Sequence, residues 1–262
     1  MKLLKKIKNN KISINLRNLF SIKSVDMSLN SIHESTSCSD TFCWRTDHGY
    51  ETIVKFSDIL KLFYDQTSLI VVDIYNHQNK HIKNVSLKNP KISNSILISK
   101  KNLNGLEDFG HFTIHHYSKK IAAKEKIIIS NRCYVGYSYK NSLPSFVHGN
   151  AIASHSNINA RSNNNKFNKE KKIVQISPIL NQNYKVQNNF NFYDKVEVFL
   201  SNPTEQLIKF NLEKKNYNLE NGRSLILKIS CKDEIMIKSN CLFLRPILFC
   251  YKSKKYIDVY HG

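Results

Sequence analysis

The stretch KSNCLFLRPILFCYKSKKYIDVYHG, residues 238–262, decides the fold of this chain. Its apolar part, residues 242–251, predicts a strand, a Lys-rich turn follows, and a second strand ends in His261-Gly262. The same plan occurs over residues 130–149, SNRCYVGYSYKNSLPSFVHG. Each copy opens with Ser-Asn, carries an arginine and an aromatic-rich strand, and closes on His-Gly. A repeat of this kind predicts two related β modules.

The chain around these copies shows short strands separated by turns. Residues 68–76, SLIVVDIYN, and 81–89, HIKNVSLKN, predict a hairpin across the polar turn 77–80. In the second half, KVEVFLSN and QLIKFNLEK match this pair, and Asn221-Gly222 predicts a turn before the next strand. At the end of the chain YIDVY alternates, which places Ile257 and Val259 on one face of a strand. Tyr256, Asp258 and Tyr260 then fall on the other face.

Composition and turn spacing favour an all-β fold of two tandem immunoglobulin-like β-sandwich modules. Ala is scarce, and β-branched and aromatic residues fill the apolar segments. One helical stripe at i, i+3, i+4 and i+7 starts at Phe56 and predicts a short helix near 56–64, with Ser57 as its N-cap.

The predicted organisation has four parts. Residues 1–36 are a basic, flexible lead, and 42–149 form the first β-sandwich module. Residues 150–171, rich in Asn, Ser and Lys, form a linker. Residues 172–262 form the second module.

The pattern of strand, Asn-containing polar turn, strand, L-x-x-G and strand resembles bacterial immunoglobulin-like sandwich modules, including those of the sensory rhodopsin transducer type. The resemblance covers about 194–230, and less clearly 71–98. It implies a fold and assigns no functional residue, since one fold hosts many functions.

The chain is strongly basic, with a formal net charge of +20. A nucleic acid or an anionic membrane surface would be the obvious partner. However, 34 of the 40 basic residues are Lys, whereas Arg is the residue that recognises phosphates and bases in a bidentate way. Lys, Asn and Ile also share AT-rich codons, so coding bias accounts for much of the charge. Nucleic-acid binding is therefore disfavoured.

Cysteine usage and hydropathy suggest a cytoplasmic protein. The six cysteines include no C-x-x-C pair, and the closest two, Cys38 and Cys43, have four residues between them. Reduced thiols are expected. Lys11, Asn15 and Arg17 interrupt any signal-peptide core, and no run approaches the ~18 apolar residues of a transmembrane helix.

Three His-Gly pairs are candidates for a metal site, at His48, His148 and His261. If the repeats pack about a pseudo-two-fold axis, these strand ends converge. Neutral imidazoles with Asp47 or Asp258 would suit a divalent metal such as Zn²⁺, Fe²⁺ or Mn²⁺. The alternative is that each His bonds locally at a strand end.

The segment HFTIHHYS holds a second histidine cluster, His111, His115 and His116. Residues of equal parity share one face of a strand, so His111 and His115 point the same way. We expect an exposed face of a half-buried strand.

Candidate binding residues are two arginines and several aromatic residues. Arg132 and Arg245 occupy related places in the repeats, either as anion anchors or as members of structural ion pairs. Glu197, Asp194 and Asp258 are the possible partners of Arg245. Aromatic side chains that suit a glycan or protein face are Trp44, Tyr134, Tyr137 and Tyr251.

Missing motifs narrow the function. With seven glycines, the chain lacks a phosphate-binding Gly-rich loop, and it has no G-x-S-x-G nucleophile elbow. The sequence favours a non-enzymatic binding or accessory protein that recognises a glycan or a protein partner. The alternatives are a metal-dependent enzyme built on the His-Gly strand ends and a Lys-rich polyanion binder.

Overall fold

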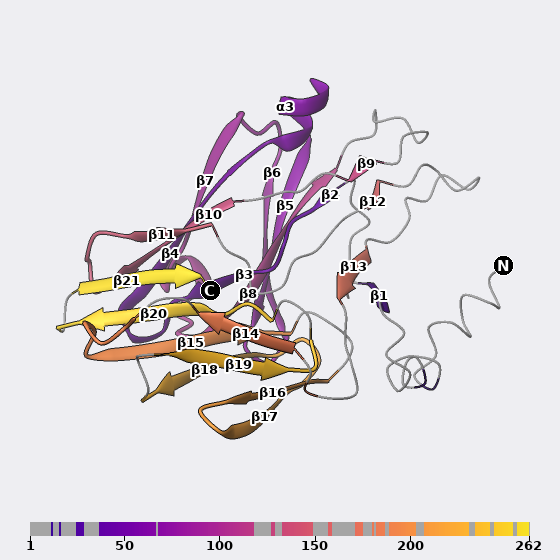
Figure 1. Ribbon diagram of the computed structural model, residues 1–262. Coiled ribbons are helices and arrows are strands. Elements are labelled where there is room, and N and C mark those ends of the chain that lie inside the picture. Colours follow the sequence, from indigo (N-terminus) through magenta and orange to yellow (C-terminus); the bar gives the residue numbers. More distant parts are fainter. Residues whose placement is uncertain are drawn as a thin grey trace.

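The computed structural model describes residues 12, 16, 25–28, 37–66, 68–117, 127–128, 133–148, 157–158, 171–174, 180, 182–186, 189–202, 207–230, 234–241, 244–253 and 256–261. Within these ranges the chain is all-β, and its paired strands are antiparallel (Figure 1). Among the same residues, no helix is both long enough and apolar enough to cross a membrane.

The first half of the chain forms two sheets. The β4 sheet has the order β11-β10-β4-β7, with β4 (Tyr50–Ser57), β7 (Ser93–Ile98), β10 (Cys133–Tyr139) and β11 (Ser145–Val147). The β5 sheet has the order β2-β8-β5-β6, and β3 also pairs with β8. Its strands are β2 (Ser37–Cys38), β3 (Phe42–Arg45), β5 (Leu69–Asn76), β6 (His81–Leu87) and β8 (Phe109–Tyr117).

The second half forms two further sheets. The β15 sheet has the order β18-β15-β20-β21, with β15 (Lys195–Ser201), β18 (Ser224–Ile229), β20 (Ile247–Lys252) and β21 (Tyr256–His261). The β16 sheet has the order β14-β19-β16-β17, with β14 (Gln182–Val186), β16 (Ile208–Leu212), β17 (Lys215–Leu219) and β19 (Ile235–Ser239).

The remaining elements are short. Two-stranded pairs join β1 (Val25–Ser28) to β13 (Lys171–Val174), and β9 (Ile127–Ile128) to β12 (Asn157–Ile158). Two 3-10 turns are η1 (Asp47–Gly49) and η2 (Lys101–Leu103). The described α-helix is α3 (Ile59–Tyr64).

The cap of α3 differs from the sequence prediction. Asp58 is the N-cap, and its carboxylate accepts the backbone N–H groups of Leu60 and Lys61. Ser57 and Phe56 belong to the end of β4, because the strand continues up to the cap. A carboxylate at this position satisfies orphan donors of the first turn.

The two repeat copies fold alike. Each gives an antiparallel hairpin, β10–β11 and β20–β21, whose second strand lies at the edge of its sheet. Elsewhere the expected match fails. β5 and β6 form the predicted hairpin, but β15 and β16 lie in different sheets. The structure therefore shows a hairpin at each of the two segments, while the internal repeat of a whole module remains a prediction.

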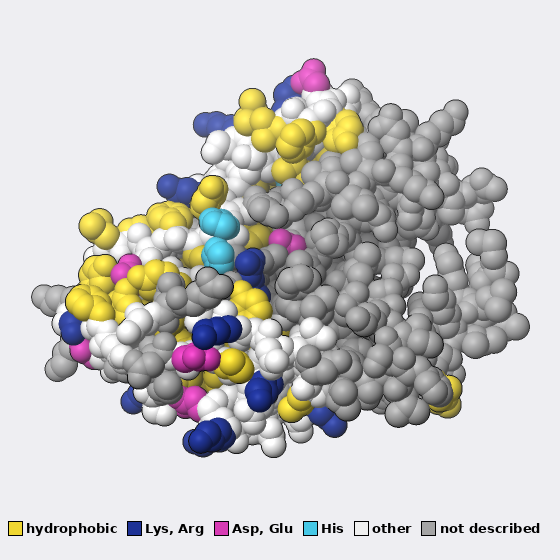
Figure 2. Space-filling model, in the orientation of Figure 1, with side chains coloured by type: hydrophobic (Ala, Val, Ile, Leu, Met, Phe, Trp, Pro, Cys, Tyr) yellow, Lys and Arg dark blue, Asp and Glu magenta, His cyan; other side chains and the backbone are white. Residues whose placement is uncertain are grey.

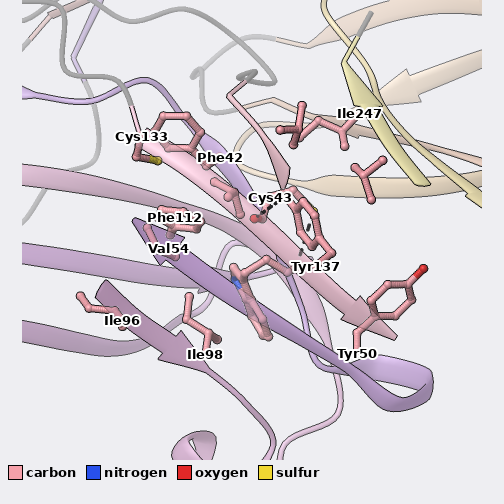
Figure 3. Packing of buried hydrophobic residues seen from close by; sticks show 14 of the residues in the cluster. Phe42, Cys43, Tyr50, Val54, Ile96, Ile98, Phe112, Cys133, Tyr137 and Ile247 are labelled. Atoms are coloured by element: carbon pink, nitrogen blue, oxygen red, sulfur yellow. Dashed lines mark hydrogen bonds between the residues drawn. The ribbon is translucent and has the colours of Figure 1, made fainter. Parts of the chain in front are cut away.

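Both faces of the central strands β15 and β20 are buried, which explains their nearly continuous apolar sequences. Alternate residues of β15 and β20, such as Val198 and Leu248, pack against the β16 sheet. Their neighbours Phe199, Ile247 and Phe249 join the core of the first half. Figure 3 shows Ile247 close to the buried residues of β3, β4 and β10. The two halves thus share a hydrophobic core, while their division into separate domains remains a prediction.

Candidate functional site

Three predicted binding residues lie in the core. Trp44 and Tyr137 are fully buried, and Tyr251 is nearly so. The Trp44 indole Nε1 donates to the Tyr75 carbonyl at 2.7 Å, and the Tyr137 hydroxyl donates to the Cys43 carbonyl at 2.9 Å. The polar atoms of these side chains are hydrogen-bonded within the protein, and burial keeps the side chains out of reach of a surface ligand.

Arg45, which the sequence did not single out, organises the junction between the halves. It is 1% exposed, and its guanidinium makes a bidentate pair with Asp47 at 2.9 and 2.8 Å. Its Nη1 donates to the carboxylate of Glu197, in the second half, at 2.8 Å. The guanidinium carbon also lies 4.1 Å from the centre of the Tyr50 ring and 4.6 Å from that of Phe249. A buried charge is tolerated only when it is paired in this way.

Two tyrosines extend this network across the junction. The Tyr50 hydroxyl donates to the Tyr251 oxygen at 2.6 Å, and Tyr251 donates to Glu197 at 2.6 Å. Burial raises the pKa of Tyr50 and of Tyr251, so both hydroxyls remain donors at neutral pH. Glu197, one of the three acids named as possible partners of Arg245, therefore pairs with Arg45.

The carboxyl of Glu197 makes stability sensitive to acid. Burial alone would raise its pKa, but the charge of Arg45 and hydrogen bonds from Lys195, Tyr251 and Arg45 lower it from 4.5 to about 2. A depressed folded-state pKa stabilises the fold above the unfolded value, and this stabilisation is lost as the pH falls towards the folded value. We therefore expect stability to fall between about pH 4.5 and pH 2.

Urea unfolding at a series of pH values checks this expectation. Glu197→Gln removes the titrating group, so its stability should change less over that pH range than the stability of the unmodified protein. If the free energy of unfolding changed with pH to the same extent in both proteins, Glu197 would not be the group responsible.

The other predicted anchors are scattered. Arg245 is partly exposed, and its Nε donates to the Tyr184 hydroxyl at 3.3 Å. Tyr134 is 59% exposed on the outer face of the β4 sheet. Arg132 lies outside the described residues. The structure thus leaves Tyr134 and Arg245 accessible but does not group them with the buried aromatics.

Two of the three histidines in the His-Gly pairs, His148 and His261, are in ring contact. The rings of His148 and His261 have centroids 4.7 Å apart, at the ends of β11 and β21. His48 lies elsewhere, because it precedes Tyr50, which pairs with Tyr139 at one end of β10, whereas Val147, next to His148, pairs with Val135. Val135 and Tyr139 are four strand residues apart, about 13 Å. A single site containing all three histidines is therefore not formed.

The second histidine cluster is buried rather than exposed, so that expectation is wrong. His111 and His115 do share a face of β8, as their parity predicts, but both are 5% exposed or less. The Nε2 atom of His115 lies 3.3 Å from the carboxylate of buried Asp73 and 3.0 Å from the Thr113 hydroxyl. His116 lies on the other face, 3.3 Å from the Ser57 carbonyl. This polar layer contributes to the interior of the β5 sheet.

A hollow of about 400 Å³ opens at one end of the second-half sheets. Apolar side chains of Leu212, Ile229 and Ile235 line it together with Glu213. The Glu213 carboxylate accepts the backbone N–H and the hydroxyl of Ser230, at 2.7 and 3.0 Å. The Glu213 carboxylate in this hollow is thus already hydrogen-bonded within the protein.

The polar face of β21 provides the most developed surface group, which we name the Asp258 cluster: Phe192, Tyr193, Tyr256, Asp258 and Tyr260. Three hydroxyls converge on one carboxylate oxygen of Asp258, from Tyr193 at 2.8 Å, Tyr256 at 2.9 Å and Tyr260 at 3.3 Å. The Tyr193 and Tyr260 oxygens also lie 2.5 Å apart. The arrangement fixes the directions of three aromatic rings around one acid.

The hydroxyls of the Asp258 cluster stay protonated. Burial and then hydrogen bonding raise the pKa of Tyr193, and the bond to Asp258 raises that of Tyr256. Burial is also the main cause of the raised pKa of Tyr260. All three tyrosines are therefore neutral donors at physiological pH.

Two rings of the Asp258 cluster face solvent. Phe192 is 62% exposed and Tyr256 is 50% exposed. Lys252 contacts both an acid and a ring, because its Nζ lies 3.3 Å from the Asp194 carboxylate and 4.8 Å from the Phe192 ring centre. The alternation of YIDVY predicted the shared face of Tyr256, Asp258 and Tyr260. Phe192 and Tyr193 come from a loop, and no periodic pattern marks them.

Comparisons with known proteins identify no family. No family model and no curated protein matches the chain. A similar solved structure is the major pilin protein T3.2 from Streptococcus pyogenes serotype GAS13637, with 9% identity, 86% of this chain and 85% of the pilin covered, and a TM-score of 0.20. Another is the ANX1 ectodomain from Arabidopsis thaliana, with 11% identity, 89% of each chain covered and a TM-score of 0.23. At these scores the likeness carries no argument, and the functional proposal rests on the site itself.

Proposed function

We propose that the protein is a non-enzymatic binding protein that recognises a glycan at the Asp258 cluster. One observation carries the proposal: three tyrosine hydroxyls hold the Asp258 carboxylate in place, and two solvent-facing rings belong to the same group. Tyr256 donates to the carboxylate, and the Phe192 ring packs edge-on against Tyr193, with centroids 5.2 Å apart. The cluster thus offers apolar faces and a fixed acceptor side by side.

These two features suit a sugar. A pyranose ring has an apolar C–H face, which packs on an aromatic ring, and hydroxyls at its rim, which need acceptors. Tyr and Phe provide large, rigid contact area at low cost in conformational entropy. The network that holds Asp258 fixes it before binding, and preorganisation of this kind favours affinity. Because Phe192 and Tyr256 are open to solvent, the cluster suits an extended oligosaccharide lying across the surface.

The finer architecture belongs to the same proposal. We propose that each half is an immunoglobulin-like sandwich module, supported by two antiparallel sheets in each half and by the matching β10–β11 and β20–β21 hairpins. A cytoplasmic location remains an expectation from cysteine usage.

A glycan-array screen followed by titration calorimetry tests the function. For the best oligosaccharide, Phe192→Ala and Tyr256→Ala should each weaken binding about fivefold, since one stacked ring contributes ~1 kcal/mol. Asp258→Asn keeps the shape and removes the charge, and a similar loss is expected. Each variant should unfold at nearly the same temperature as the unmodified protein, except Asp258→Asn, which disturbs three hydrogen bonds.

Phe63→Ala is the matched control, because Phe63 is an aromatic residue on α3, outside the Asp258 cluster, that is 69% exposed. Its binding should equal that of the unmodified chain. The proposal fails if the three cluster variants bind as tightly as this control, or if the array shows no glycan bound while a protein partner is captured through another face.

A further inference from the structure

We infer that His148 and His261 form a site for a divalent transition-metal ion that joins the two halves of the chain. The side chains come from the ends of two edge strands, β11 and β21, far apart in the sequence. Their rings are in contact, with centroids 4.7 Å apart and an interplanar angle of 63°. Figure 2 shows two adjacent histidine side chains on the surface in the region where Figure 1 places the ends of these strands.

The ring separation fits joint ligation. A Zn²⁺–N bond is about 2.0–2.1 Å long, and the ring centre lies ~1 Å beyond the nitrogen, so two imidazoles on one tetrahedral ion have centres about 5 Å apart. The observed separation of 4.7 Å is close to that value. His148 is exposed and His261 is partly exposed, so an ion has access from solution.

The backbone already holds the two strand ends together. The Val259 N–H donates to the Ser145 hydroxyl oxygen at 3.0 Å and so ties β21 to β11. His261 is itself paired with Ile247 in the β20–β21 ladder. Tyr134 packs against His148, with ring centroids 6.0 Å apart. Ligands fixed in this way lose little freedom when an ion binds.

The chemistry of the ligands selects the ion. Imidazole suits Zn²⁺, Ni²⁺ and Cu²⁺, whereas Mg²⁺ and Ca²⁺ prefer oxygen ligands. Among the residues that the structure describes, no group of three or more His, Cys, Asp or Glu could hold a metal, so these residues supply two ligands here. The other positions would be filled by water or by a group of a bound partner.

Calorimetric titration of the full-length protein with ZnCl₂, together with thermal melts, tests the site. We expect saturable binding and a rise in melting temperature, because an ion that binds only the folded chain stabilises it. His148→Gln and His261→Gln should each weaken Zn²⁺ binding tenfold or more. His48→Gln, at the other end of the β4 sheet and highly exposed, is the matched control and should leave binding unchanged.

Three results would overturn the inference. The first is that the unmodified chain does not bind Zn²⁺ at about 1 mM, where even weak complexes form. The second is that the His148→Gln/His261→Gln double variant binds Zn²⁺ as tightly as the unmodified chain. The third is that MgCl₂ raises the melting temperature as much as ZnCl₂ does. None of these measurements depends on glycan binding, so they test the metal site separately from the proposed function.

Discussion

Replacing Arg45 with Met should lower the free energy of unfolding by about 3–5 kcal/mol, the usual cost of removing one partner from a buried ion pair. The substitution leaves the carboxylates of Asp47 and Glu197 without the guanidinium that both contact. It also removes the cation that packs on the Tyr50 and Phe249 rings. Urea unfolding monitored by circular dichroism measures the loss.

Arg245→Met is the matched control for Arg45→Met. Arg245 is partly exposed and makes one long bond, 3.3 Å, to the Tyr184 hydroxyl. Its removal should cost less than about 1 kcal/mol. A double variant, Arg45→Met/Glu197→Leu, should recover part of the loss, since apolar replacement of both partners removes the uncompensated charge. Equal effects of Arg45→Met and Arg245→Met would contradict the central place of Arg45 at the junction.

Gly110→Ala should be the second severe substitution, with a loss of about 3 kcal/mol from steric strain in a packed sheet. Gly110 lies in β8 between Trp44 of β3 and Asn76 of β5. A Cβ atom there would come within 2.1 Å of the Tyr75 carbonyl oxygen and 2.7 Å of the Asn76 carbonyl carbon, and both are backbone atoms. The same Tyr75 carbonyl accepts the Trp44 indole N–H, so the strain should also break that bond.

The single tryptophan makes this change observable. Trp44 is fully buried, so its fluorescence in Gly110→Ala should shift to longer wavelength as its surroundings loosen. Gly105→Ala is the control, because a Cβ at Gly105 meets nothing within 4 Å and only its positive φ of 86° is unfavourable. The explanation is wrong if the two variants have the same stability and the same emission spectrum.

Local patterns predicted the parts of the fold that depend on local physics. The β5–β6 hairpin follows from a polar turn between two apolar runs. The β10–β11 and β20–β21 hairpins follow from the similar patterns of residues 130–149 and 238–262. Alternation in YIDVY placed Asp258 between two tyrosines on one face. In each case the signal lies within a few neighbouring residues.

The sequence could not predict features that depend on distant contacts. Arg45 meets Glu197 across the junction, and nothing near either residue specifies the partner. Burial of His111 and His115 also depends on tertiary structure, because strand parity states which residues share a face and not whether that face is covered. For the same reason the short apolar strands β15 and β16 looked like a hairpin, although each pairs within a different sheet.

Three of the five residues of the Asp258 cluster could be placed on one face from the sequence. Strand residues Tyr256, Asp258 and Tyr260 follow from period-2 alternation, whereas Phe192 and Tyr193 reach the cluster from a loop. Three aromatic residues that were expected to bind a ligand are instead large side chains buried in the core: Trp44, Tyr137 and Tyr251. Aromatic content alone does not separate core residues from binding residues.

A crystal structure of the protein with the best oligosaccharide from the array tests the binding proposal most directly. The account predicts a sugar ring packed on Phe192 or Tyr256, with a sugar hydroxyl donating to the Asp258 carboxylate. A sugar bound instead beside Tyr134 on the β4 sheet, or in the hollow next to Glu213, with the Asp258 cluster free of ligand, would contradict it.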